Sequence, residues 1–209
     1  MYLVTPPTLL KKYYGPNVIW EIPTLNKELF LTFDDGPHPE ITPIVLGLLE
    51  KFNAKATFFC VGENVEKYPE VYQSILQQGH TVGNHTYNHF NGLKTKTETY
   101  ISNIEKCAEY VSSNLFRPPY GVLKRSQIKE ISTDYKIIMW NTLSADYDQN
   151  TSEEGCWENV KQNSKNGSII VFHDSEKAKI NMLFALTKTL EYFSELEFVF
   201  KKINFESTP

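Results

Sequence analysis

The feature that most constrains the fold is an alternation along the chain. Short apolar runs rich in β-branched and aromatic residues are followed repeatedly by longer segments with helical periodicity. Strands that alternate with helices pair in parallel, because each helix carries the chain back to the same edge of the sheet. Roughly seven such units predict a distorted (β/α) barrel of about seven or eight strands, with a doubly wound open sheet as the alternative.

The expected elements follow from this pattern. Strands are expected at residues 29–33, 56–62, 81–83, 115–116, 137–140, 168–172 and 198–203, and helices at 40–52, 68–78, 97–112, 126–132, 153–165 and 179–193. In the first of these helices, Ile44, Leu48 and Leu49 are expected on one face. Residues 1–27 do not fit the repeat, and we expect them to form an extension, a hairpin or a cap, that packs on residues 28–209 within one structural domain.

Composition narrows the class of protein. With 209 residues and 41% apolar residues, the chain can bury one substantial core. A net charge of −4 provides no basic patch, so neither nucleic acid nor an anionic membrane is an expected partner. No apolar stretch approaches the ~18–20 residues of a membrane span. Oligomeric state cannot be read from these features.

Cysteine usage and the N-terminus bear on location. The three cysteines, Cys60, Cys107 and Cys156, are odd in number and contain no Cys-x-x-Cys motif, so reduced thiols are expected. The first residues lack a charged segment followed by an apolar run, so they do not read as a signal peptide. A cytoplasmic location is therefore expected, or a secreted or periplasmic one if the sequence has been trimmed.

Ionisable residues gather just past the predicted strands. Five different strands are followed by such groups: Asp34-Asp35, His85, Arg117, Asp146 and His173-Asp174. In a (β/α) barrel the carboxyl ends of the strands form the face on which active sites are built. This pattern predicts one site on one rim.

His85 and His89 are the first candidate metal ligands. A spacing of four residues would place both imidazoles on one side of a helical turn, facing one ion. Asp34 and Asp35 supply carboxylates, one of which can bind the ion while the other stays free as a base. Two histidines and one carboxylate with open positions suit zinc, iron or cobalt. Taken alone, the Asp-Asp-Gly-Pro run that contains the two aspartates would read as a turn.

The other histidines differ in position. His173 follows an apolar run, and beside a metal site it becomes a candidate general acid because the ordinary pKa of histidine lies near neutral pH. His80 precedes a strand and is interpreted as structural. His38 lies in a turn and is left without a specific role.

At these residues the chain resembles a known family, the polysaccharide deacetylases of the NodB-homology type, also called carbohydrate esterase family 4. The resemblance covers residues 28–200 and five motifs in order: residues 32–37 (TFDDGP), 85–89 (HTYNH), 117–121 (RPPYG), a partial match at 140–147 and a match at 171–173. It implies that residues 28–209 form a deacetylase catalytic domain with a distorted barrel fold.

The resemblance also implies a role for each site residue. Asp35, His85 and His89 would hold one divalent ion, with zinc expected and cobalt, nickel, iron or manganese as alternatives. Asp34 would be the general base, Arg117 would orient it, and the backbone N–H of Tyr120 would stabilise the oxyanion. His173 would protonate the leaving amine as an N-acetyl group is hydrolysed from a hexosamine. The supporting or substrate-binding residues are expected to be Pro119, Trp140, Asp146, Tyr147, Val171 and Asp174.

Two positions depart from the family pattern. The fourth motif begins with an aspartate in the family, expected to support the acid histidine, whereas this chain has Leu143. We therefore hypothesise that Asp146 or Asp174 supports His173. In the fifth motif Val171 replaces leucine, which predicts a slightly wider pocket for the acetyl methyl group.

Three alternatives to an N-deacetylase remain open at this point. An O-acetyl esterase acting on xylan would tolerate a weakened acid, because alcohols leave more easily than amines. A glycan-binding pseudoenzyme would be expected to lack Asp34 or a metal ligand, and both are present. A glycosidase would need carboxylates facing each other at ~5–9 Å, which adjacent residues rarely provide. The expected partner is an N-acetylated glycan or oligosaccharide, on which Tyr87, Phe90, Tyr120, Trp140 and Tyr147 could stack.

Overall fold

The structure is a computed structural model that describes residues 3–205. Its strands are β1 Val18–Ile19, β2 Glu28–Asp34, β3 Ala56–Cys60, β4 Thr81–Asn84, β5 Leu115–Phe116, β6 Lys136–Ile138, β7 Thr142–Leu143, β8 Ile169–His173 and β9 Val199–Phe200. Its α-helices are α1 Thr8–Tyr14, α2 Ile41–Lys51, α3 Gly62–Lys67, α4 Pro69–Gln77, α5 Thr97–Ala108, α6 Arg125–Ile131, α7 Glu153–Asn163 and α8 Lys179–Glu195, and η1 Pro119–Gly121 is a single 3₁₀ turn.

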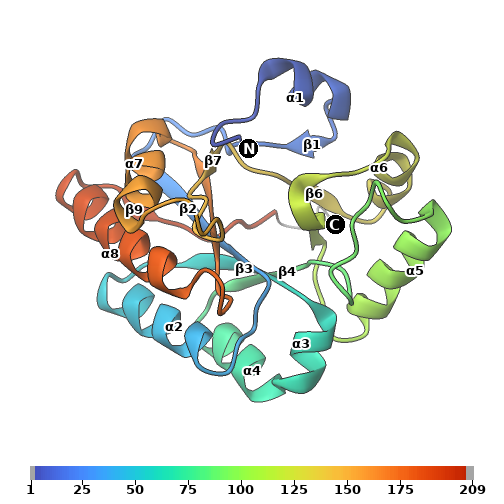
Figure 1. Ribbon diagram of the computed structural model, residues 1–209, viewed down its shortest axis with the longest axis horizontal. Coiled ribbons are helices and arrows are strands. Elements are labelled where there is room, and N and C mark those ends of the chain that lie inside the picture. The colour runs from blue at the N-terminus through green and yellow to red at the C-terminus, as the bar shows by residue number, and fades with distance from the viewer. Residues whose placement is uncertain (1–2, 206–209) are drawn as a thin grey trace.

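The strands form one parallel sheet that curls into an incomplete barrel. Their order is β1-β6-β5-β4-β3-β2-β8-β7, and β9 pairs with β2 off this path. Helices surround the sheet, with α2, α3 and α4 along one side and α7 and α8 along another (Figure 1). The distorted (β/α) barrel predicted from the alternation is confirmed, and it opens between β1 and β7, the two ends of the strand path.

Strand β2 is an inner strand of the sheet and is buried from Leu29 to Asp34. It pairs with β3 on one side and β8 on the other, and the register aligns Asp34 with Phe59 and with His173. The parallel arrangement therefore delivers Asp34 and His173 to the same edge, as the carboxyl ends of parallel strands require.

Helix α2 differs from the prediction in the face that it buries. Its core contacts come from Ile41, Val45, Leu46 and Leu49, whereas Ile44 is 44% exposed. The expectation was wrong for Ile44, because the buried face follows the four-residue spacing of Ile41, Val45 and Leu49. Leu49 is buried as expected, and Leu48 is partly buried against the same core.

Two short elements, helix α3 and strand β7, had no counterpart in the sequence-based expectation. The expected strand 56–62 ends at Cys60, because Gly62 already begins α3. The short strand β7 lies between Trp140 and Asp146, where only a loop was expected. Both elements are too brief to show a clear periodicity.

The N-terminal segment forms a helix and an edge strand. Strand β1 pairs in parallel with β6, so the segment is not a hairpin. Tyr14, Val18 and Trp20 are buried in a core cluster together with Phe116 and Ile137. Within the part of the chain that the structure describes, no helix is long and apolar enough to cross a membrane, and Cys60, Cys107 and Cys156 are free and buried.

Candidate active site and metal centre

Four of the ionisable residues predicted at the strand ends, Asp34, Asp35, His85 and His173, line one pocket of about 570 Å³, whereas Arg117, Asp146 and Asp174 do not line it. The pocket is lined by Asp34, Asp35, His85, His89, Tyr120, Gly121, Trp140, Leu143, Tyr147, Val171, His173, Ser175 and Lys177. Contributions come from the ends of β2, β4, β7 and β8 and from η1. The single rim site predicted from the sequence is therefore assembled by the sheet.

Asp35, His85 and His89 form a group that could hold a metal ion. Their ligand atoms all lie within 4.8 Å of one another. Asp35 Oδ1 is 3.1 Å from His89 Nε2 and 3.9 Å from His85 Nε2. His85 Nδ1 lies 2.7 Å from the carbonyl oxygen of Arg117, so Nδ1 carries the proton and Nε2 keeps its lone pair for an ion.

The loop that joins the two histidines is not helical. Thr86 has φ 64° and His89 has φ 56°, both in the left-handed region, and no helix includes residues 85–89. The expectation of a shared helical turn was wrong. The imidazoles converge because the loop folds back on itself, which places their ring centroids 5.1 Å apart.

Helix α5 holds this loop in place through Asn103. The Asn103 Oδ1 atom accepts hydrogen bonds from the backbone N–H groups of Tyr87 and Asn88, each at 3.0 Å. Its Nδ2 group donates to Asn88 Oδ1, also at 3.0 Å. The buried Asn103 amide thus accepts the backbone N–H groups of this loop. Residues in the left-handed region persist only where surrounding contacts fix them, and Asn103 supplies such contacts.

The electrostatic surroundings suit these residues as ligands. Burial lowers the pKa of His85 to about 4, so its imidazole is neutral at neutral pH. Burial alone would raise the pKa of Asp35, but the hydrogen bond with His89 and the nearby histidines hold it below its ordinary value. A neutral imidazole next to an ionised carboxylate is the donor set that a divalent cation prefers.

Asp34 and Arg117 form a buried ion pair beside this group. Arg117 Nη1 is 2.7 Å from Asp34 Oδ1 and also donates to Thr32 Oγ1 at 2.7 Å. Its other donors reach the carbonyl oxygens of Ile138 and Met139, and its side chain is fully buried. These four hydrogen bonds hold the guanidinium in place, and it in turn orients the Asp34 carboxylate.

His173 is paired with Asp146. The distance from His173 Nδ1 to Asp146 Oδ1 is 2.7 Å, and Asp146 Oδ2 accepts the backbone N–H of His173 at 2.8 Å. Burial alone would lower the pKa of His173, but the Asp146 carboxylate raises it to about 9. Asp146 is therefore the partner of His173 in this chain, which has Leu143 where the family's fourth motif begins with an aspartate. Leu143 itself lines the pocket wall.

Asp174, the other candidate partner of His173, points elsewhere. Its Oδ1 accepts the backbone N–H of Gly36 at 3.1 Å, and its Oδ2 accepts the hydroxyl of Thr42. Burial raises the pKa of Asp174 to about 7. A Cβ atom at Gly36 would lie 2.2 Å from Asp174 Oδ2, so this carboxyl braces the turn after Asp35.

The turn η1 closes the pocket on the side of His89. Tyr120 has φ 61° and its ring centroid lies 4.7 Å from that of His89. Gly121 has φ 64°, and a Cβ there would lie 2.4 Å from Trp140 Cη2. The Tyr14 hydroxyl donates to Gly121 O at 2.9 Å. The turn is thus held by a tryptophan on one side and the N-terminal segment on the other, and Pro119 at its start is buried.

Several sequence-based candidates lie outside the pocket. The Tyr87 hydroxyl donates to Glu66, and Phe90 packs on a core cluster, so neither aromatic lines the site. His80 Nδ1 accepts the backbone N–H of Ala56, which agrees with a structural role. His38 Nδ1 accepts the backbone N–H groups of Glu40 and Ile41 at the start of α2.

Ser175 and Lys177 line the pocket but were not singled out from the sequence. Their one signal was their position directly after His173-Asp174, in the loop that follows a strand at the active-site face.

Comparison with known proteins agrees with the motifs. Residues 21–137 match the family model described as polysaccharide deacetylase. Two peptidoglycan-N-acetylglucosamine deacetylases of Bacillus cereus are similar: one is 38% identical over 71% of this chain, and the other is 36% identical over 87%. The matched region spans 56% of the length of the first relative and 90% of the second.

A solved structure extends the comparison to the fold. The crystal structure of a peptidoglycan N-acetylglucosamine deacetylase, in complex with 4-naphthalen-1-yl-N-oxidanyl-benzamide, superposes with a TM-score of 0.86. The two are 32% identical, and the match covers 95% of each chain. This chain belongs to the polysaccharide deacetylase family, carbohydrate esterase family 4, with the NodB-type fold.

Proposed function

We propose that the protein is a metal-dependent hydrolase that removes N-acetyl groups from N-acetylhexosamine residues of glycans or oligosaccharides and releases acetate. One observation carries the proposal: a single pocket is lined by the Asp35–His85–His89 group, by Asp34 as a candidate base and by His173, whose Nδ1 pairs with Asp146. The names of the similar B. cereus enzymes point to N-acetylglucosamine as the hexosamine.

The residues present fit a divalent metal ion. Asp35, His85 and His89 offer one oxygen and two nitrogens close together, and His85 already has its second nitrogen bonded to a carbonyl. Zinc is the expected ion because it favours such mixed nitrogen and oxygen ligands with an open position. When bound, the ion would polarise the acyl oxygen and make the attacking water more acidic.

Asp34 is assigned the role of general base. It lies in the pocket next to the Asp35 group, and its Oδ1 is held by Arg117 at 2.7 Å. It would accept a proton from the attacking water, and Arg117 would keep the carboxylate in place during that transfer. The backbone N–H of Tyr120 would help to stabilise the oxyanion, with the metal ion on the opposite side.

His173 is assigned the role of general acid. An amine is a poor leaving group until it is protonated, so amide hydrolysis needs a proton donor. The pKa of His173, raised to about 9 by Asp146, keeps the imidazole protonated at neutral pH. The weakened acid that would have favoured an O-acetyl esterase is therefore absent, and amide cleavage is the function that the geometry supports best.

The first experiment combines metal analysis with acetate release from N-acetylglucosamine oligomers. We expect about one equivalent of metal, with activity lost on chelation and restored by zinc or cobalt. Asp34→Asn serves as the matched inactive control, because it keeps the shape of the side chain and removes its charge. Acetate release that survives complete metal removal would refute the proposal.

A parallel assay with a matched acetyl ester tests the class of bond. A higher kcat/KM on the ester than on the N-acetyl substrate would replace the deacetylase with the O-acetyl esterase. Bound metal without acetate from either substrate would reject both hydrolases for these sugars.

A further inference from the structure

The start of helix α3 packs against the loop that carries the two histidine ligands. The N–H groups of Gly62 and Glu63 donate to the carbonyl oxygens of Thr86 and Tyr87, each at 3.0 Å. A Cβ atom at Gly62 would lie 2.8 Å from Tyr87 Cδ2, so a side chain there would displace the tyrosine ring. The helix and the histidine loop are therefore in direct contact, and the hydrogen bonds between them are made by the backbone.

The residues on either side of this pair hold the turn that carries Asp35. The N–H of Val61 donates to Gly36 O at 2.9 Å, and Nδ2 of Asn64 donates to Asp35 O at 2.7 Å. Because a carbonyl oxygen can only accept a hydrogen bond, the Asn64 amide must face it with its nitrogen. Residues 61–64 thus link the turn of the carboxylate ligand to the loop of the two histidine ligands.

The backbone of Asp35 needs such support. Its φ of 82° lies in the left-handed region, which residues other than glycine rarely adopt. A residue in this region persists where surrounding contacts fix it, and Asn64 supplies a hydrogen bond to the carbonyl group of Asp35 itself. The direction of the side chain follows from the backbone, and it now places Asp35 Oδ1 3.1 Å from His89 Nε2. A relaxed backbone would turn the carboxylate away from the histidines.

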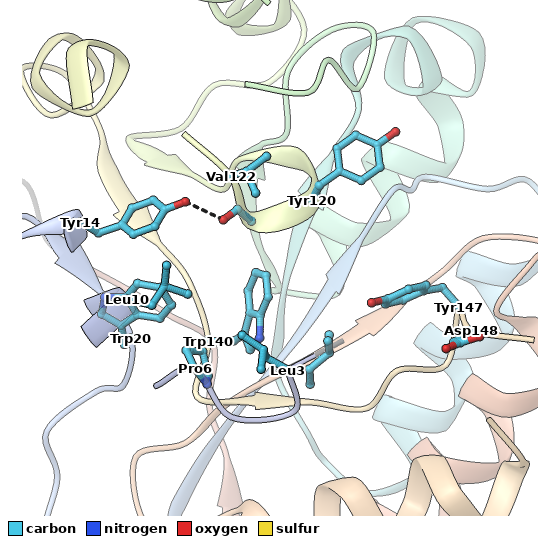
Figure 2. A pocket seen from close by; sticks show the side chains of 12 residues that line it. Leu3, Pro6, Leu10, Tyr14, Trp20, Tyr120, Val122, Trp140, Tyr147 and Asp148 are labelled. Carbon is cyan, nitrogen blue, oxygen red and sulfur yellow. Dashed lines mark hydrogen bonds between the residues drawn. The ribbon is translucent and has the colours of Figure 1, made fainter. Parts of the chain in front are cut away.

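Two other left-handed turns of the site have a support of the same kind. The Asn103 side chain accepts two backbone N–H groups of the histidine loop. Figure 2 shows the Tyr14 hydroxyl reaching the turn that carries Tyr120, where it donates to Gly121 O. In each case a polar side chain from another element bonds the backbone of the turn. Asn64 has this place at Asp35.

Asn64 is not among the described residues that line the catalytic pocket, so it acts on an ion only through Asp35. We propose that Asn64 is a positioning residue that holds Asp35 in the orientation required for metal binding. The proposal rests on the proposed function in one respect, the presence of a divalent ion at Asp35, His85 and His89. Groups that orient a metal ligand commonly change metal affinity by about 10–100-fold when they are removed.

The test compares Asn64→Leu with the wild-type protein. Leucine is similar in size to asparagine, cannot donate a hydrogen bond and favours a helix more strongly, so α3 should still form. Competition with a chelator should show that zinc affinity falls by about 10–100-fold. The thermal midpoint of the metal-free protein should stay close to the wild-type value, which separates a lost support of Asp35 from a general loss of stability.

The cobalt-loaded proteins provide a second readout. The visible absorption of bound cobalt depends on the number and geometry of its ligands, so the bands should change in Asn64→Leu. A variant that was only less stable would give the wild-type spectrum when folded and fully loaded. Lys67→Ala, at an exposed position of the same helix, is the matched control and should keep both the zinc affinity and the spectrum of the wild type.

Asn64→Asp is a second variant that separates the hydrogen bond from charge. Its carboxylate cannot donate to Asp35 O, and the added negative charge alone would attract a cation. We expect weaker zinc binding than in the wild type, because the lost support outweighs the added charge. Tighter zinc binding in Asn64→Asp, or wild-type zinc affinity with an unchanged cobalt spectrum in Asn64→Leu, would overturn the proposal.

The metal measurements also separate the two proposals, since they need no turnover. If the wild-type protein binds zinc but releases no acetate, and Asn64→Leu binds zinc more weakly, the proposed function fails and the role of Asn64 stands. If acetate release depends on metal but Asn64→Leu binds zinc like the wild type, the function stands and the role of Asn64 fails.

Discussion

Two histidine–carboxylate arrangements face each other across the catalytic pocket and behave in opposite ways. His85 lies near Asp35, and its pKa is lowered to about 4, whereas His173 lies against Asp146, and its pKa is raised to about 9. The His85 side chain is 2% exposed and the His173 side chain 13% exposed. The difference comes from the partner of Nδ1, which is a backbone carbonyl for His85 and an ionised carboxylate for His173.

This contrast shows how one residue type acquires two roles within one pocket. Burial favours the neutral form of both histidines, and only His173 has a carboxylate close enough to reverse the effect. A neutral imidazole offers a lone pair to a cation, and a protonated one offers a proton to a leaving group. Opposed pKa values at neighbouring groups are a reliable way to recognise acid and ligand assignments.

The largest expected effect comes from removing His85, the neutral histidine. In His85→Ala the ion would lose one of its three protein ligands, so bound metal should fall from about one equivalent to nearly none. Acetate release should fall at least about a thousandfold, since both the acyl oxygen and the water lose their activation. Metal content by mass spectrometry and acetate release measure the two effects. A variant that keeps its metal and its activity would remove His85 from the ligand set.

The next largest effect is expected from removing His173, the protonated histidine. His173→Ala should reduce kcat by about a hundredfold to ten-thousandfold, the usual contribution of a general acid. Bound metal should stay at the wild-type level, which distinguishes this variant from His85→Ala. Parallel metal analysis and steady-state kinetics provide the check. Loss of metal in His173→Ala would contradict the assignment of metal binding to His85 and of proton donation to His173.

A smaller effect is expected from loosening the support of the metal loop. Asn103→Ala removes the amide that binds the Tyr87 and Asn88 backbone, so metal affinity should fall about 10–100-fold. Competition with a chelator measures the affinity without any turnover. Ser102→Ala, exposed on the same helix, is the matched control and should bind metal like the wild type. Unchanged affinity in Asn103→Ala would show that the loop holds its shape unaided.

The last expected effect, a displacement of the pH profile in Asp146→Asn, is smallest at acidic pH, where His173 is protonated in both proteins. Activity needs protonated His173, which is present below its pKa of about 9 and is lost as the pH rises through that value. Removing the carboxylate lowers this pKa, so the alkaline limb of the kcat profile should move to lower pH. Rates on that limb fall about tenfold for each unit of the shift. Asp134→Asn, an exposed site, is the control; identical profiles for both variants would exclude Asp146 as the source of the raised pKa.

Sequence reasoning predicted the fold correctly but not the local geometry of the candidate site. The strand–helix alternation predicted a distorted barrel, and the candidate residues lie at strand ends as expected: Asp34 and His173 end β2 and β8, and His85 follows β4. The helical turn expected between His85 and His89 was wrong, because left-handed residues at Thr86 and His89 fold the loop. Spacing alone cannot distinguish a helical pair from a loop whose shape is imposed by a neighbouring helix.

The support of His173 illustrates the same limit. The sequence narrowed its partner to Asp146 or Asp174, but both are near the end of a strand and both are carboxylates. The choice depends on contacts formed after folding. Asp174 accepts hydrogen bonds from Gly36 and Thr42. Asp146 is therefore the carboxylate that pairs with Nδ1 of His173.

The amino-acid sequence by itself determined the class of fold and the chemical groups available at the rim, because periodicity and residue type are local properties. Tertiary structure decided which of those groups meet, which histidine is neutral, and that the N-terminal segment packs against the turn at Gly121. Tyr14 and Gly121 are 107 residues apart, and His173 and Asp146 are 27 apart. Contacts across such separations depend on how the sheet curls and how its loops pack, so a pattern of neighbouring residues does not contain them.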